Sequence, residues 1–128
     1  QLSENTELFH NDIQGRFARG EPDIIDAMEE WAGLAQQCRD LLSQDKGQEI
    51  GPLLNRNFDL RKSVYHLSQG NLAMIEAARA AGASAKFTGS GGAIVGVYDG
   101  EEMFERILSK LTPLGVKVLK PIITSQEF

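Results

Sequence analysis

The chain has 128 residues, of which 41% are hydrophobic and 24% are charged, a size and composition typical of one soluble globular domain. Its net charge of -5 and pI of about 5.0 argue against non-specific binding to nucleic acid or to an anionic membrane. The single cysteine excludes an internal disulfide, and with only two histidines a zinc site is not expected. We therefore expect a cytoplasmic protein with no metal site, nucleic-acid partner or membrane partner.

We expect neither a membrane span nor a signal peptide in this sequence. No apolar stretch approaches the roughly 18 residues that would span a bilayer, and no signal peptide precedes the first helical pattern. The first residue is Gln1 rather than methionine, and we expect the sequence to be a piece of a longer chain.

The first two predicted helices are amphipathic. Apolar residues recur every fourth position in residues 7–19, at Phe9, Ile13 and Phe17. A second helix is predicted for about residues 22–44, because Pro22 fits a first helical turn. Its apolar residues have the alternating spacing of a packed helical seam: Ile24, Met28, Trp31, Ala35, Cys38 and Leu42.

A third predicted helix, about residues 48–67, places two polar residues, Asn57 and Arg61, within its apolar arc. A buried guanidinium requires an anionic or acceptor partner. That partner is either a carboxylate of the same protein or a ligand in a cleft beside the helix. The arc consists of Ile50, Leu53, Leu54, Phe58, Leu60, Val64 and Tyr65, and the predicted solvent-facing residues are Asn55, Asp59 and Lys62.

A fourth helix is predicted for about residues 69–82, with Ser68 as its N-cap and Gly82 as its stop. The hydrophobic period then changes. Residues 84–88 and 93–98 predict two strands, and their four-residue connection makes them antiparallel.

A further helix is predicted from Gly100 to about Thr112, and residues 116–121 predict a third strand that Pro121 terminates. Four N-terminal helices followed by β-β-α-β predict an α+β fold, with helices covering one face of a small antiparallel sheet.

The loop between the first two strands, within KFTGSGGA at residues 86–93, is richer in glycine than a tight hairpin requires. Successive glycines let backbone N–H groups converge on an anion, and Thr88 and Ser90 add hydroxyl donors. The pattern is not a Walker loop, because no Lys-Ser or Lys-Thr pair follows the glycines, and it is not a dinucleotide fingerprint, because a strand rather than a helix follows it. A flexible hairpin and a cradle for a phosphate both remain open on these residues.

Two motifs at this spacing carry a family resemblance: NRNFDLRKSVY at residues 55–65, and EAARAAGASAKFTGSGGAIVGVY at residues 76–98. They resemble the C-terminal half of GHMP-superfamily small-molecule kinases, whose third, glycine-rich motif is similar to GSGGA. NFDLR together with KFTGSGGA is most similar to the sugar-kinase branch that includes glucuronokinase. The resemblance covers nearly the whole chain, roughly residues 5–122.

The resemblance implies a ferredoxin-like C-terminal domain of a two-domain enzyme that transfers the γ-phosphoryl of ATP to a sugar. The ATP loop, the catalytic aspartate and the Mg²⁺ ligand of such kinases belong to an N-terminal domain, to which nothing in this chain corresponds. We therefore expect residues 1–128 to lack catalytic residues, to partner an N-terminal kinase domain, and to be inactive alone. The missing half would also leave an unpaired sheet edge that promotes self-association.

The resemblance implies that the glycine loop lines the interdomain cleft. The candidate substrate- or phosphate-binding residues are Asn57, Arg61, Thr88, Gly89, Ser90, Gly91 and Gly92. A uronic acid, a heptose phosphate and a neutral hexose all fit polar cleft residues, and Arg61 favours an acidic sugar. The alternative is a free-standing, non-catalytic module that binds a small anion.

Overall fold

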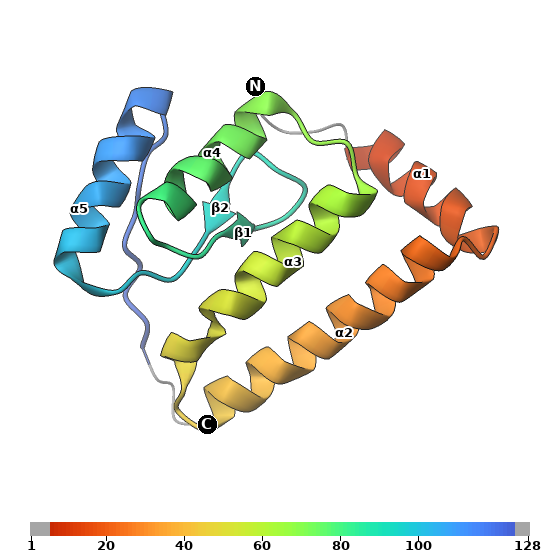
Figure 1. Ribbon diagram of the computed structural model, residues 1–128, viewed down its shortest axis with the longest axis horizontal. Helices are drawn as coiled ribbons and strands as arrows, with labels where there is room; N and C mark the ends of the chain where they lie inside the picture. The colour runs from red at the N-terminus through yellow and green to blue at the C-terminus, as the bar shows by residue number, and fades with distance from the viewer. Residues whose placement is uncertain (1–5, 125–128) are drawn as a thin grey trace.

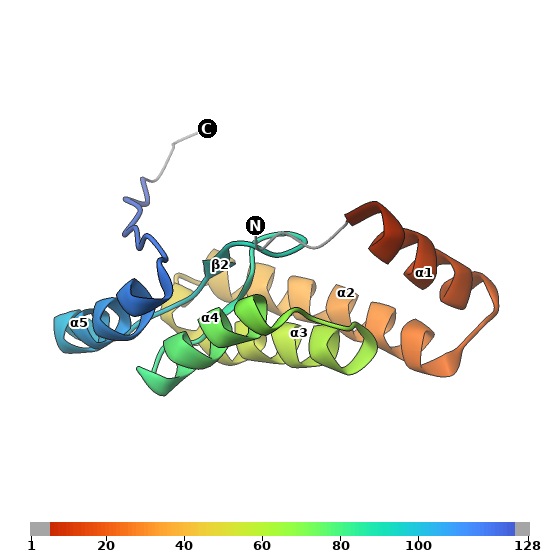
Figure 2. The same ribbon diagram turned by 90° about the horizontal axis from the view of Figure 1, so that it is seen from above.

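A layer of helices with a short hairpin on one face makes up the structure, a computed structural model that describes residues 6–124 (Figures 1 and 2). α2 and α3 run antiparallel side by side, and α5 lies beside α4. This arrangement confirms the predicted α+β fold. The elements are α1 (Thr6–Ala18), α2 (Pro22–Ser43), the 3₁₀ turn η1 (Gly47–Ile50), α3 (Gly51–Val64), α4 (Gln69–Ala80), β1 (Lys86–Phe87), β2 (Ile94–Val95), α5 (Gly100–Leu111) and the 3₁₀ turn η2 (Thr112–Leu114).

The buried side of α2 differs by one position from the predicted seam at several points. Ala27 and Leu34 are buried, whereas Met28, Ala35 and Leu42 are exposed. Burying Leu34 removes far more apolar surface from water than burying Ala35. The helix therefore presents Leu34, rather than Ala35, to the protein interior. The stripe predicted for α1 is only partly described: Ile13 is buried and Phe17 exposed, but the side chain of Phe9 lies outside the described residues.

The hydrophobic core lies between α3, α4 and the hairpin. Phe58 of α3 and Phe87 of β1 meet edge to face, with ring centroids 5.3 Å apart, an arrangement that adds to the stabilisation from burial alone. Ser68 caps α4, as predicted, by accepting a hydrogen bond from the N–H of Asn71. Gly82 follows α4 with a φ of 102°, which confirms its predicted role as the stop.

Asn55 was wrongly predicted to face solvent. Its side-chain oxygen accepts hydrogen bonds from the N–H of Ala85 at 2.9 Å and from Nε of Arg79 at 3.1 Å. Arg79 also pairs with Asp59, Nη1 to Oδ1, at 2.8 Å. The helical wheel failed here because α3 has neighbours on both sides, α2 on one and the hairpin on the other.

β1 and β2 are antiparallel, as predicted, with Lys86 opposite Val95 and Phe87 opposite Ile94. The strands are shorter than expected, although hydrogen bonds continue the pairing from Ser84 to Val97 and from Thr88 to Ala93.

The predicted third strand is not formed: residues 116–124 pair with no strand in the described part of the chain. Val116 and Val118 pack beside the cluster that contains Ile107 and Leu111, and the segment then leads away from the helices (Figure 2). Alternating apolar residues gave the segment its strand pattern, but a strand also requires a partner for its backbone.

Gly96 permits the close approach of the two hairpin arms, since a Cβ there would lie 2.0 Å from the main-chain oxygen of Ser84. We predict that Gly96→Ala lowers the free energy of unfolding by about 1–3 kcal/mol, because the backbone must shift to relieve the overlap. Urea denaturation measures the loss. Gly33→Ala is the control: it adds a Cβ in open space on α2 and should stabilise the protein by about 0.5–1 kcal/mol. Equal effects of the two substitutions would contradict the prediction.

Candidate functional site

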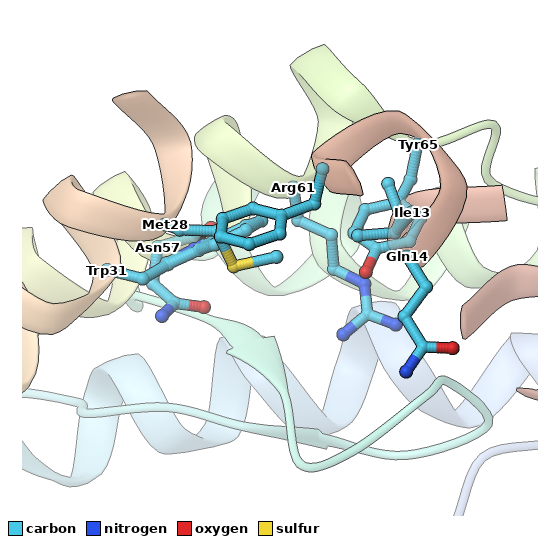
Figure 3. Close-up of a pocket in the computed structure, with 8 residues that line it drawn as sticks. Ile13, Gln14, Met28, Trp31, Asn57, Arg61 and Tyr65 are labelled. Carbon is cyan, nitrogen blue, oxygen red and sulfur yellow. Dashed lines mark hydrogen bonds between the residues drawn. The ribbon is translucent and has the colours of Figure 1, made fainter. Parts of the chain in front are cut away.

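Arg61 connects α3 to the glycine loop. Its Nη1 donates to the carbonyl oxygen of Gly89 at 2.8 Å, and its Nη2 donates to that of Ser90 at 3.0 Å. Its guanidinium carbon lies 5.2 Å from the centre of the Tyr65 ring and 5.0 Å from that of Phe87, within the range of cation–π attraction. Figure 3 shows the side chain reaching from α3 toward the hairpin.

The acceptors that Arg61 was predicted to require are therefore main-chain carbonyls. The two hydrogen bonds go to main-chain oxygens rather than to the carboxylate that was one of the two predicted partners. The planar fork of a guanidinium suits two neighbouring acceptors, which a single ammonium cannot match. Arg61 therefore fixes the position of the loop.

Asn71 holds the other end of the loop and was not among the predicted site residues. Its side-chain oxygen accepts a hydrogen bond from the N–H of Gly92 at 2.9 Å, and the residue is fully buried. The available signal was a polar residue on an apolar helical stripe, because Asn71 lies four positions before Ile75 and seven before Ala78. A buried amide in such a place needs a specific partner.

Both glycines at the end of the loop have left-handed backbone conformations, with φ of 140° at Gly91 and 82° at Gly92. Residues with a Cβ rarely adopt these angles. A loop of the same length with other residues here would be strained, so the glycines are required by the path of the main chain.

Lys86 adds a second cation beside the loop. Its side chain is half-buried on β1, and its Nζ donates to the carbonyl oxygen of Phe87 at 2.7 Å. Burial, and secondarily the charge of Arg61, lower the pKa of Lys86 below its ordinary value. Thr88 is exposed at the rim and Ser90 is half-buried. Cationic and hydroxyl groups thus gather at the loop.

Asn57 and Arg61 both line an open groove of about 660 Å³ between α1, α2 and α3 (Figure 3). The main-chain oxygen of Asn57 accepts a hydrogen bond from Nε1 of Trp31 at 3.3 Å. The structure therefore brings Arg61 together with the loop and places Asn57 in the adjoining groove. The groove is lined by Ile13, Gln14, Phe17, Met28, Trp31, Asn57, Arg61 and Tyr65.

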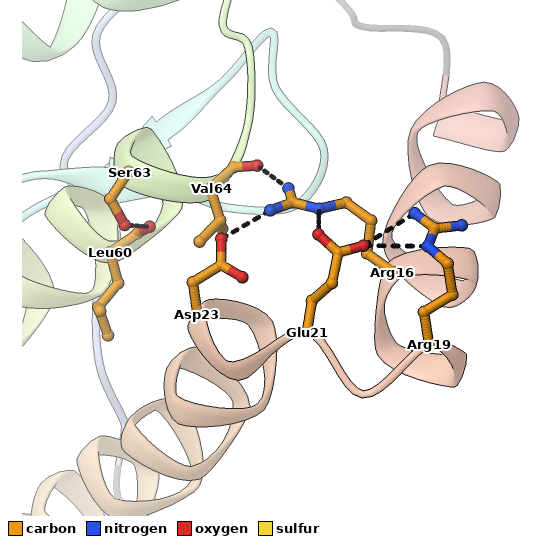
Figure 4. A network of polar contacts seen from close by, with 7 residues as sticks. All are labelled: Arg16, Arg19, Glu21, Asp23, Leu60, Ser63 and Val64. Atoms are coloured by element: carbon orange, nitrogen blue, oxygen red, sulfur yellow. Dashed lines mark hydrogen bonds and ion pairs between the residues drawn. The ribbon is translucent and has the colours of Figure 1, made fainter.

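An arginine cluster fixes the α1 wall of this groove (Figure 4). Arg16 pairs with Glu21 at 3.0 Å and with Asp23 at 2.6 Å, and donates to the carbonyl oxygen of Val64 at 3.1 Å. Hydrogen bonds from Arg16, and then from Arg19, hold the pKa of the Glu21 carboxyl below its usual range. One side chain thereby joins α1, the start of α2 and the end of α3.

The described residues contain no group of three or more histidine, cysteine, aspartate or glutamate side chains placed to bind a metal ion. Within the same part of the chain, no helix has the length and apolar character needed to cross a membrane. The groups that converge on the loop are cations, hydroxyls and backbone amides, which bind anions rather than metals.

Residues 38–117 match the family model of the C-terminal domain of GHMP kinases. The chain belongs to this family. The matched range contains Asn57, Arg61, Lys86, Asn71 and the whole glycine loop, whereas α1 and most of α2 lie before it. The resemblance inferred from the two motifs is thereby confirmed.

Two plant proteins are similar to this GHMP kinase domain. It is 44% identical over 89 residues to a probable glucuronokinase 2 of Arabidopsis thaliana, and 38% identical over 89 residues to glucuronokinase 1 of the same plant. Each match covers 67% of this chain but only 24% and 25% of the two relatives. The chain thus spans about a quarter of the length of the relatives that it matches.

The fold is similar to that of a solved structure, L. major mevalonate kinase in complex with R-mevalonate, with a TM-score of 0.76. That comparison covers 88% of this chain and 35% of the mevalonate kinase, at 20% sequence identity. It shows a shared fold.

We predict that Lys86→Met raises the melting temperature at neutral pH, because the lowered pKa of Lys86 means that the folded protein disfavours its charge. Burial of the charged Lys86 side chain destabilises the folded wild-type protein at neutral pH. This destabilisation is lost as pH rises from the lowered pKa of the folded state toward 10.5, the ordinary pKa of lysine. The stability difference between variant and wild type should therefore shrink at high pH.

Thermal melts between pH 7 and pH 10 measure this difference. The control is Lys117→Met, which replaces an exposed lysine and should change stability by less than about 0.5 kcal/mol. Destabilisation by Lys86→Met at every pH would show that the hydrogen bond to Phe87 outweighs the burial penalty.

Proposed function

We propose that this chain is the substrate-cleft part of an ATP-dependent sugar kinase that phosphorylates a uronic acid. The observation that carries the proposal is the fixed glycine loop with Arg61 and Lys86 beside it, inside the family-matched range. The two similar plant proteins are named as glucuronokinases, which supports a glucuronate-type acceptor. Two cations near the loop favour an acceptor or donor that carries negative charge.

In this proposal, the loop residues position the phosphate groups or the acceptor at the cleft. The candidate contacts are main-chain N–H groups of Gly89, Ser90, Gly91 and Gly92, with the hydroxyls of Thr88 and Ser90. Arg61 and Lys86 contribute positive charge behind and beside the loop, and Asn57 lines the adjoining groove. Phosphoryl transfer depends on such positioning and on electrostatic stabilisation of the charge on the transferred group.

ATP and Mg²⁺ are the proposed cofactors of the whole enzyme. The donor set of this chain suits phosphate oxygens, and its described residues offer no carboxylate cluster for Mg²⁺. We therefore assign the ATP loop, the Mg²⁺ ligand and the catalytic aspartate to a separate N-terminal domain. The short coverage of the plant relatives, 24% and 25%, is consistent with such a partner. Mg²⁺ would neutralise charge on the phosphates, while this chain orients them.

The proposal is tested with the full-length protein, ATP and Mg²⁺, by measuring the formation of the phosphorylated product from glucuronate, glucose and mevalonate. We expect turnover with glucuronate and a kcat/KM at least tenfold lower for glucose, which lacks the carboxylate. Turnover of mevalonate in preference to both sugars would overturn the acceptor class. No turnover, combined with tight phosphate binding, would favour the non-catalytic module.

Residues 1–128 alone should give no product with millimolar ATP, Mg²⁺ and the same sugars, because one wall of a cleft cannot position both reactants. A coupled ADP-release assay, with the full-length enzyme as positive control, measures this. Turnover by the isolated chain would show that the catalytic groups lie within it.

In the full-length enzyme, Gly92→Val should lower kcat/KM by about 100-fold or more, since the loop must leave its position to relieve the strain at a φ of 82°. Gly115→Val is the matched control: it introduces similar backbone strain at a φ of 74° beyond α5. Both variants should lose stability by about 1–3 kcal/mol, but only Gly92→Val should lose activity. Equal losses of activity in the two variants would show that Gly92→Val acts by destabilising the fold rather than by displacing the loop.

A further inference from the structure

The hydrogen bonds of Arg61 determine where the N–H groups of the loop point. In a trans peptide unit the C=O and N–H bonds point in opposite directions, and the peptide units that follow Gly89 and Ser90 are trans. Arg61 draws the carbonyl oxygens of Gly89 and Ser90 toward α3. The N–H groups of Ser90 and Gly91, which belong to the same two peptide units, are therefore directed away from α3.

Asn71 has the opposite effect on the next peptide unit. Its side-chain oxygen takes the N–H of Gly92 inward, at 2.9 Å. This N–H is thereby directed toward α4, and the rotation between the peptide units before and after Gly91 takes place at Gly91, whose φ is 140°. The N–H groups of Ser90 and Gly91 thus point away from α3, whereas that of Gly92 is bound to Asn71.

We infer that Arg61 and Asn71 are positioning residues, which act through the glycine loop to present the N–H groups of Ser90 and Gly91 to a phosphate oxygen. Adjacent main-chain N–H groups pointing the same way form an anion-binding concavity. The inference rests on the proposed function in one respect: the phosphate is that of the donor or of the phosphorylated product. It gives Arg61 a role that differs from direct binding of the acceptor carboxylate.

The surroundings of Arg61 support a fixed, indirect role. Its guanidinium lies near the rings of Tyr65 and Phe87, at 5.2 Å and 5.0 Å, and both terminal nitrogens donate to the loop. These two hydrogen bonds use two of the five N–H donors of the guanidinium and fix its orientation at the loop. A side chain held by rings and carbonyls together is preorganised and loses little freedom when a ligand binds.

The first experiment titrates inorganic phosphate into the full-length protein with ¹⁵N-labelled serine and glycine, and follows the amide resonances by NMR. The amide signals of Ser90 and Gly91 should shift and saturate together, while that of Gly92 should move much less. Chloride at equal ionic strength is the control. A Gly92 shift as large as the other two, or unmoved Ser90 and Gly91 signals, would overturn the inference.

The second experiment compares phosphate affinity in three variants. Arg61→Lys keeps the charge but loses the fork, and Asn71→Leu keeps neutrality and approximate size but loses the acceptor. Each should raise the Kd for phosphate about tenfold or more, a loss of about 1.4 kcal/mol. Lys62→Met, which removes an exposed charge from the same helix, should change the Kd by less than about twofold.

The outcomes separate the alternatives. If Arg61→Lys binds phosphate as tightly as the wild type, Arg61 acts as a charge and the positioning role is wrong. Because Asn71 is fully buried, circular dichroism must show that Asn71→Leu is folded; Arg61→Lys, at a half-buried site, provides the decisive test if it is not. Absence of sugar kinase turnover would overturn the proposed function while leaving the phosphate titration to decide this inference.

Discussion

The contact between Arg61 and the carbonyl oxygens of Gly89 and Ser90 is the interaction on which the site depends. A glycine-rich loop loses more backbone entropy on ordering than other sequences do, so it needs strong partners to keep one conformation. Arg61 is such a partner, and its guanidinium lies beside the rings of Tyr65 and Phe87. Core packing and loop geometry are thereby coupled: a change in how Phe87 packs against Phe58 would also move the guanidinium.

Local patterns predicted the helices well, because caps and periodicity act over a few residues. Ser68 and Gly82 bound α4 as expected, and the hairpin pairs antiparallel around its glycine loop. The one-position error on α2 arose because apolar spacing alone does not distinguish Ala35 from Leu34, although burying Leu34 removes more apolar area from water. The third strand failed for a different reason: alternation in residues 116–121 describes one face of a segment but does not supply the neighbouring strand that would complete it.

The polar residues inside helices were informative but only partly interpretable. Arg61 was recognised as needing a partner, yet a main-chain acceptor 28 residues away could not be chosen from a helical wheel. Asn55 and Asn71 both bind main-chain N–H groups of the hairpin region, at Ala85 and Gly92. Such contacts form only after the tertiary fold brings the segments together, so a single helix pattern cannot assign them. The sequence does show a polar residue at a position expected to be buried. Because burying a polar side chain without a hydrogen bond is unfavourable, such a residue predicts that a partner exists.

The electrostatic character of the loop is local rather than global. The chain carries a net charge of -5, so its overall field would repel a phosphate, and at physiological ionic strength that field is screened within about 8 Å. Arg61 and Lys86 act within that distance of the loop, in surroundings that are partly desolvated. Their mutual repulsion contributes to the lowered pKa of Lys86, and a bound anion between or beside them would relieve it. An anion that binds beside these two cations would therefore stabilise the folded hairpin, which would link the stability of the hairpin to ligand binding.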